Sequence, residues 1–356
     1  MVRKRTRKSK KPRSTSSSAT NAADDTQQEK IANSAMLQTT KRRYTLIGAF
    51  SIPVILLVAF VTTQMLSDTT LARPFPTLAF ITPWNTDGLT LALEQAQHLD
   101  YVAPVWYEYS NTKLHGTDDA AAHAEWILQA KASGLGVVPR FLLNVNTISA
   151  AKDILSIHSI NSIVREVSKY NFDGVVVETP VTGIPVLADQ IKRFTEKLSH
   201  TLGPTRPVFL VVPGHVNLAT VAPLTEVDYF VLSAYDFTTS GKAGPLTPFS
   251  WVQTMAEDWS REYPRRMIVG VPFYARCGAE VVNTKDLEVD PDEALVVDGE
   301  KVGDRGDGVA CYFQDAETLC MRSCAFRRMG VGVSVWELGQ GYGALVEALA
   351  CDCDKL

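Results

Sequence analysis

The stretch Asn171-Phe-Asp-Gly-Val-Val-Val-Glu-Thr-Pro180 decides the fold of this chain. Its apolar run is continuous rather than alternating, which is typical of a parallel strand that is covered on both faces. Side chains two residues apart share one face of a strand, so Val176, Glu178 and Pro180 are predicted to point the same way. The stretch therefore predicts a buried parallel strand that ends in a single carboxylate.

Similar apolar runs recur along the chain on both sides of this stretch. With it, they give eight strand candidates: Thr77–Ile81, Tyr101–Trp106, Gly136–Arg140, Gly174–Glu178, Val208–Val212, Tyr229–Ala234, Met267–Phe273 and Gly332–Trp336. Segments such as Ala120–Lys131, Ser156–Tyr170 and Pro185–His200 lie between them and carry apolar residues three and four apart, as amphipathic helices do. This alternation predicts an α/β fold, a (β/α)8 TIM barrel over residues 77–350. A doubly wound sheet is the alternative, but no Gly-x-Gly-x-x-Gly follows any strand. Residues 277–307 are acidic and predict an insertion or long loop.

The N-terminal residues differ sharply in charge from the rest. Residues 1–43 hold 12 of the 35 basic residues and 3 of the 39 acidic ones, so the remainder has a net charge of about −13. Such an acidic domain would repel nucleic acid. The Ser/Thr-rich composition of residues 14–40 predicts a disordered spacer within a basic cytosolic tail, residues 1–43.

Residues 44–66 carry no charge and are long enough to cross a bilayer as one helix. Basic residues lie directly before them, which favours a single-pass signal-anchor with a cytosolic N-terminus. A linker, residues 67–76, would then lead to a barrel in the lumen or outside the cell, within the secretory pathway (endoplasmic reticulum, Golgi, lysosome or surface). A cleaved signal peptide ending near Thr70-Leu-Ala72 is the alternative.

All six cysteines lie in the last quarter of the chain: Cys277, Cys311, Cys320, Cys324, Cys351 and Cys353. An even number beyond a membrane segment permits disulfides, and Cys277 with Cys311 is the first candidate pair. Partly buried free thiols are the alternative. The histidines and cysteines show no zinc-ligand spacing, so no metal site and no cofactor are predicted.

Four stretches at the ends of the predicted strands resemble those of glycoside hydrolase family 18. They are Asn171–Pro180 on the fourth strand, Ser233-Ala-Tyr-Asp-Phe237 on the sixth, Met267-Ile-Val-Gly-Val-Pro-Phe-Tyr274 on the seventh, and Gly330-Val-Gly-Val-Ser-Val-Trp-Glu-Leu-Gly-Gln-Gly341 on the eighth. Within the family, the resemblance is closest to the chitinase-domain-containing, stabilin-interacting chitinase-like group. Four details carry it: Thr82-Pro-Trp-Asn85, Val138-Pro-Arg140, Phe172–Glu178 and Trp336-Glu-Leu-Gly-Gln-Gly341.

The resemblance implies that the catalytic acid is missing. The family pattern on the fourth strand is Asp-x-x-Asp-x-Asp-x-Glu, in which the Glu is the general acid and the preceding Asp orients the substrate's acetamide. Here Val176 replaces an inward Asp, Glu178 takes the acetamide-orienting position, and Pro180 takes the position of the acid. Glu178 lies about 6–7 Å below that position, too far to protonate the same oxygen. We therefore expect no hydrolysis by the usual mechanism.

The resemblance also implies a carbohydrate ligand, an oligosaccharide containing N-acetylglucosamine. Its predicted contacts are Glu178, Tyr235, Asp236, Trp336, Trp84 and Trp106. One alternative is a protein-interaction module with a vestigial cleft, which binds a membrane receptor or a lumenal protein through its outer helices or residues 277–307. The other is an active glycosidase that uses a displaced acid: Glu108, Glu178 or Glu337.

Overall fold

The computed structural model describes residues 75–350 and Cys353, apart from positions 146, 222, 236, 239 and 240. The predicted tail, residues 1–43, the predicted anchor, residues 44–66, and nearly all of the predicted linker lie outside the described residues. Asp236, a predicted ligand contact, also lies outside them.

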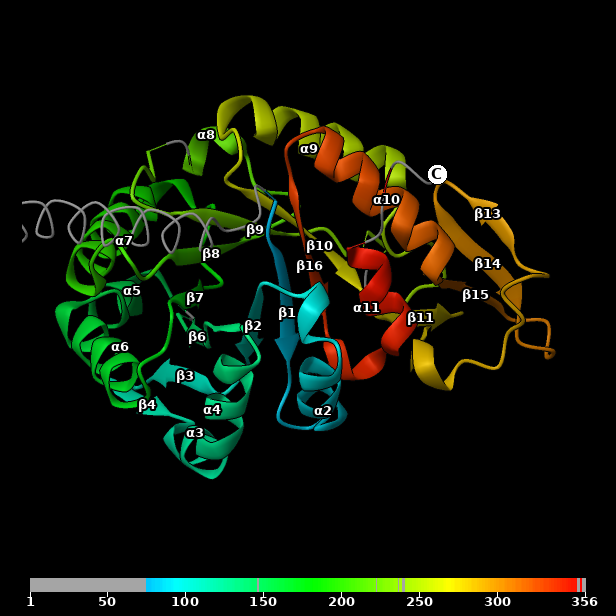
Figure 1. Cartoon of the computed structure of the whole chain (residues 1–356). Coiled ribbons are helices and arrows are strands. Elements are labelled where there is room, and N and C mark those ends of the chain that lie inside the picture. Colours follow the sequence, from blue (N-terminus) through cyan, green and yellow to red (C-terminus); the bar gives the residue numbers. More distant parts are fainter. Residues whose placement is uncertain are drawn as a thin grey trace, which may run out of the picture. The chain divides into compact units, whose positions relative to one another are not determined.

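The core of the fold is a closed parallel barrel (Figure 1). Its strands are β1 (Thr77–Ile81), β2 (Tyr101–Pro104), β3 (Tyr107–Ser110), β5 (Gly136–Val137), β6 (Arg140–Leu143), β7 (Val175–Glu178), β8 (Val208–Pro213), β9 (Tyr229–Ser233), β10 (Met267–Pro272) and β16 (Gly332–Trp336). The consecutive strands β2 and β3 pair with β5 and β6 respectively, so each couple forms one interrupted barrel strand. β16 pairs with both β10 and β1, which closes the barrel at eight strand positions.

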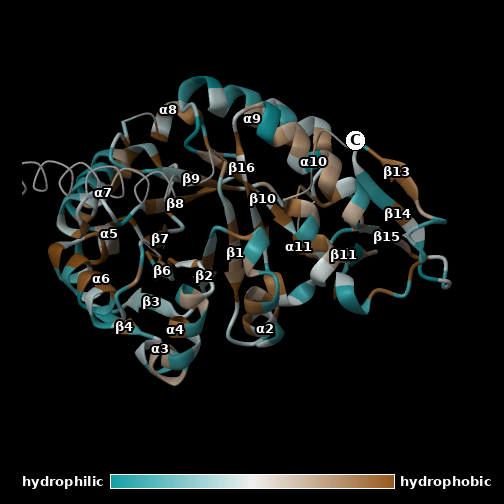
Figure 2. Ribbon diagram, viewed as in Figure 1, coloured by the Kyte–Doolittle hydropathy of each residue, from teal (hydrophilic) through white to brown (hydrophobic). Residues whose placement is uncertain are grey.

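Helices surround the barrel and bury its outer face. They are α2 (Asp87–Glu94), α3 (Thr117–Ala122), α4 (Ala124–Ala132), α5 (Ile148–Ile154), α6 (Ile157–Tyr170), α7 (Ala188–Leu202), α8 (Leu218–Val221), α9 (Phe249–Glu262), α10 (Ala316–Arg328) and α11 (Gly343–Leu349), with 3-10 turns at Ala96–His98, Pro185–Leu187, Thr284–Asp286 and Leu338–Gln340. Aliphatic and aromatic side chains fill two layers, one inside the barrel and one between strands and helices. Figure 2 shows the apolar strands enclosed by helices whose polar faces point outward.

The predicted fold class is corrected in one respect: the described part of the chain contains no membrane-spanning helix, and the predicted anchor, residues 44–66, lies outside that part. Across residues 75–350, each helix is too short or too polar to cross a bilayer, the longest being α7 with 15 residues.

Residues 274–313, between β10 and α10, form a second, antiparallel sheet rather than a loop. Its strands are β11 (Tyr274–Cys277), β12 (Glu280–Asn283), β13 (Leu295–Val297), β14 (Glu300–Asp304) and β15 (Ala310–Phe313), in the order β12-β11-β15-β14-β13. Cys277 and Cys311 lie opposite each other on β11 and β15 and form a disulfide, which confirms the predicted pair. A second disulfide joins Cys324 to Cys353, and Cys320 is also disulfide-bonded. The alternative of free thiols is therefore wrong for the described cysteines.

Three aspartates tie neighbouring strands together at the N-terminal end of the barrel. Each lies one or two residues before a barrel strand. Its carboxylate accepts a hydrogen bond from a backbone N–H at the start of the preceding barrel strand. Asp100 accepts from Thr77 N at 2.8 Å, Asp173 from Val137 N at 2.9 Å, and Asp228 from Val208 N at 2.8 Å. Strands one and two, three and four, and five and six are each joined in this way, on the face opposite the barrel mouth.

Replacement of Asp173 by Ala should lower the free energy of unfolding by about 1–3 kcal/mol, because it orphans the buried Val137 N–H and removes the carboxylate that pairs with Lys131 at 2.6 Å. Chemical denaturation measures this change. The exposed Asp153→Ala, on α5, is the matched control and should cost less than about 0.5 kcal/mol. Equal effects of the two substitutions would contradict a clamping role for Asp173.

Candidate functional site

The candidate site lies at the C-terminal mouth of the barrel, where TIM-barrel sites form. Glu178 ends β7 and points inward, two residues after Val176, which is buried in the barrel interior. Arg140 begins β6, pairs in register with Val176, and therefore also points inward. Its Nη1 donates to Glu178 Oε2 at 2.7 Å, forming an ion pair between neighbouring strands.

Arg140 also reaches the far side of the mouth. Its Cζ lies 5.9 Å from the ring centroid of Trp336, which ends β16. Since β7 and β16 are the fourth and eighth barrel positions, they lie on opposite sides of the barrel. Arg140 thus spans the mouth between Glu178 and Trp336, and its guanidinium lies against an aromatic ring in a cation–π contact.

Trp336 belongs to a small aromatic group over the barrel interior. Tyr235 lies near-parallel to it, with centroids 6.2 Å apart, and Phe80 packs against it from inside the barrel at 5.4 Å. Tyr235 OH donates to Ser233 Oγ at 3.3 Å. Gly270 permits this packing, because a Cβ there would lie 3.0 Å from the Tyr235 ring. Glu178, Tyr235 and Trp336, all predicted from the sequence, therefore surround one mouth.

Two buried polar atoms in this region have unused hydrogen-bonding capacity. Arg140 Nε and Ser334 Oγ are shielded from solvent and make no hydrogen bond to the residues that the structure describes. Buried polar groups are normally paired, so the mouth has capacity for a water molecule or a polar ligand. Pro180, which the resemblance places at the position of the acid, is exposed.

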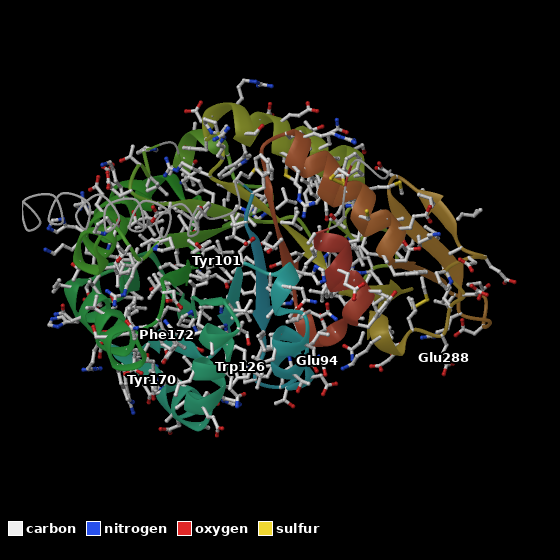
Figure 3. All side chains as sticks on the ribbon, in the orientation of Figure 1. Glu94, Tyr101, Trp126, Tyr170, Phe172 and Glu288 are labelled. Atoms are coloured by element: carbon white, nitrogen blue, oxygen red, sulfur yellow. A yellow bond between two sulfur atoms is a disulfide. The ribbon has the colours of Figure 1, made fainter. Side chains whose placement is uncertain are left out.

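Trp84 and Trp106 differ in their access to a ligand. Trp84 follows β1 and is 73% exposed, so its ring is open to a ligand at this end of the barrel. Trp106 is only 6% exposed and packs between His123 and Trp126, the latter labelled in Figure 3. The prediction that Trp106 contacts ligand is therefore corrected, since its ring is part of the core.

The second barrel strand contains a bulge, which changes the facing of the residues beyond Trp106. Val102 pairs with Val137, and Tyr107 pairs with Phe141, so four residues of the second strand stand opposite three of the third. The extra residue reverses the alternation of side chains beyond it. Glu108 consequently points inward, whereas strict alternation along the strand would have turned it outward.

The other two displaced-acid candidates already have hydrogen-bonding partners. Glu108 accepts from Asn144 Nδ2 at 2.8 Å and lines a cavity of about 320 Å³ at the ends of β3 and β6. Glu337 is buried and accepts from Asn85 Nδ2 at 2.8 Å and Gly339 N at 3.1 Å. Burial raises the pKa of Glu337, and these hydrogen bonds partly offset the rise. Glu337 thus fixes the turn after β16 rather than facing the mouth.

Buried charges of the antiparallel sheet hold the loop that follows Tyr235. Arg276 donates to Thr238 O at 2.7 Å and to Lys242 O at 3.3 Å. Glu300 accepts from Leu246 N and Thr247 N, and burial raises its pKa to about 7. Sequence reasoning missed these residues and Arg140. The available signal for Arg140 was its position two residues after Val138, which points inward, because side chains two apart on a strand share one face.

No protein-family model matches the chain. Among solved structures, a class V chitinase from Pseudomonas fluorescens Pf-5 aligns with a TM-score of 0.65 and 16% identity, covering 77% of this chain and 98% of that one. A family 18 chitinase from Cycas revoluta gives 0.65 at 10% identity, with coverage of 77% and 98%. The spore cortex-lytic enzyme SleL of Bacillus cereus gives 0.64 at 15%, with coverage of 77% and 73%.

The chain has a chitinase-like fold. At these identities the likeness concerns the fold alone, and it confirms the family 18 resemblance at that level. The mouth of this chitinase-like barrel carries an arginine–carboxylate pair.

Breaking the pair should leave one charge partly buried without its partner. Glu178→Leu and Arg140→Leu should each lower the free energy of unfolding by about 1–3 kcal/mol, and the double variant should lose less than their sum. A double-mutant cycle by chemical denaturation measures this coupling. The exposed Arg261–Asp258 pair, with side chains 74% and 57% exposed, is the control and should show almost none. Strict additivity at Arg140 and Glu178 would contradict the pair.

Proposed function

We propose that this protein is a non-hydrolytic, chitinase-like binder of N-acetylglucosamine-containing oligosaccharides, closest to the stabilin-interacting chitinase-like group. The observation that carries the proposal is the Arg140–Glu178 ion pair at a mouth where Pro180 takes the position of the family's acid. The charged and aromatic groups needed to hold a sugar are present there. The proton donor needed to cleave it is absent from that position.

Loss of hydrolysis follows from three features of the mouth together. Departure of a sugar alkoxide without a general acid forfeits a factor on the order of 10² to 10⁴ in rate, and Pro180 supplies no acid. Val176 is a buried aliphatic side chain where the family pattern has a carboxylate. Glu178 is paired with Arg140 at 2.7 Å and lies two residues before the acid position, about 6–7 Å from it, too far to reach the same oxygen.

Binding of a sugar is supported by the same residues. Trp336 and Tyr235 offer aromatic surface, Glu178 accepts hydrogen bonds from sugar hydroxyls, and Trp84 is open to solvent nearby. The family 18 chitinase from Cycas revoluta, which shares the fold, has been solved with (GlcNAc)3 and (GlcNAc)4. Its ligand class is the one that we extend to this chain.

We also propose that the barrel resides in an oxidising compartment, in the secretory pathway or outside the cell. Cys277–Cys311 and Cys324–Cys353 support this, because structural disulfides persist where thiols are not kept reduced. A protein partner is compatible with the sugar site.

Calorimetric titration of the full chain with chito-oligosaccharides tests the proposal. We expect saturating heats for the wild type and at least about tenfold weaker binding for Trp336→Ala, because the mouth loses its aromatic floor. Leu128→Ala, at an exposed position of α4 outside the mouth, is the control and should bind normally. Heat flow that persists after saturation would reveal turnover, and the absence of any heat would refute this ligand class.

Restoration of the acid alone should not restore hydrolysis. In a Pro180→Glu variant the new carboxyl would still stand over Val176 and beside a Glu178 held by Arg140, so we expect no release of fluorophore from a fluorogenic chitobioside. Binding of chito-oligosaccharide by the same variant is the control for an intact mouth. Measurable turnover by Pro180→Glu would show that the missing acid was the only defect.

A further inference from the structure

The antiparallel sheet ends in a strand whose outer edge is open. In the part of the chain that the structure describes, β13 pairs only with β14 and is the terminal strand of the sheet. Its three residues are all apolar and exposed: Leu295 at 72%, Val296 at 51% and Val297 at 51%. Figure 2 shows β13 as an apolar strand beside the polar β14. An open edge with β-branched side chains is a template for pairing with another strand.

Carboxylates lie before and after this strand. Residues 286–298 contain six exposed acidic side chains and no basic one: Asp286, Glu288, Asp290, Asp292, Glu293 and Asp298. The first of them, Asp286, accepts from Asn283 of β12, and Figure 3 labels Glu288 in the segment that leads from there to β13. Glu293 precedes the apolar strand by two residues and Asp298 follows it directly, so the strand has negative charge at both ends.

The edge is held in a fixed position by the residues behind it. On β14, which pairs with β13, Lys301 is buried and lies 3.3 Å from Asp315 and 3.5 Å from Glu317. Its ammonium also donates to Pro291 O at 3.1 Å, which anchors the acidic segment just before β13. The adjoining β15 is joined to β11 by the Cys277–Cys311 disulfide. A preorganised edge loses little conformational freedom when a partner strand is added.

We propose that β13 is a docking edge for an extended basic segment of a partner protein, which adds to the sheet as a further strand. Backbone hydrogen bonds along β13 and apolar contacts with Leu295, Val296 and Val297 would supply affinity. The flanking carboxylates would select lysine or arginine at both ends of the segment. A second copy of this chain is disfavoured by the same charges, because pairing β13 with itself brings two acidic segments together.

The opposite edge of the same sheet provides a matched control. On β12, the terminal strand there, Val281 is 50% exposed, almost the same as Val296. Its neighbour Glu280 is paired with Arg305 at 3.0 Å. Val296→Lys and Val281→Lys therefore introduce the same charge at equally exposed positions of two different edges.

The experiment titrates the full chain into a fluorescent peptide, Lys-Lys-Thr-Val-Thr-Val-Thr-Lys-Lys, and follows anisotropy. We expect saturable binding that weakens as salt rises, and at least about tenfold weaker binding by Val296→Lys, because a charge then blocks the apolar edge. Val281→Lys should bind within about twofold of the wild type. Asp292→Asn with Glu293→Gln should weaken binding about threefold to tenfold. A peptide with glutamates in place of lysines should not bind.

Three results would overturn the proposal. The first is failure of the basic peptide to bind, or equal losses in the two lysine variants, when circular dichroism shows all variants folded. The second is a wild-type dimer in light scattering that Val296→Lys converts to a monomer, which would assign the edge to a second copy. The third is peptide binding that emerges only when residues 1–43 are deleted, which would assign the edge to the chain's own basic tail.

Discussion

A carboxylate at the mouth of an aliphatic barrel needs a positive partner, and Arg140 provides it for Glu178. Below the pair, the interior is filled by apolar side chains such as Val176 and Phe80, which offer neither charge nor hydrogen bonds. Transfer of an unpaired carboxylate to such a place is costly, so the two side chains depend on each other. Arg140 is long enough to touch Trp336 as well, and the pair therefore fixes the arrangement of the whole mouth.

Ion pairs of this kind are weak evidence for stability, because desolvation of two charges consumes most of their attraction. An apolar pair would fill the same space with little loss in stability. The half-exposed Glu178, the orphaned Arg140 Nε and the aromatic ring of Trp336 make more sense as groups that meet a polar ligand. The function proposed above separates acid catalysis from ligand orientation and assigns these groups to the second.

The sequence predicted the parts of the structure that follow strict periodicity. Continuous apolar runs located the parallel strands, and the inward series through Val176 and Glu178 was correct because β7 contains no irregularity. The bulge between β2 and β3 was not predicted, although Pro104 within it is a local signal, and it turns Glu108 inward. The sequence analysis assigned no role to Arg140, because the partner of a buried charge depends on the tertiary structure. The antiparallel strands of residues 274–313 were hidden among acidic and turn-forming residues.

That second sheet has two sides with different tasks. Through Arg276 and Glu300 it holds the loop after Tyr235, so part of the geometry of the mouth depends on side chains outside the barrel. Glu300 lies on β14, and the next strand outward is β13, whose edge is open. Arg276 and Glu300 are buried and bond to backbone groups of that loop, so their replacement should disturb it. The carboxylates around β13 are exposed, so their replacement should change the stability of the fold little. A surface with that freedom can acquire a partner without disturbing the mouth, because β14 separates the two.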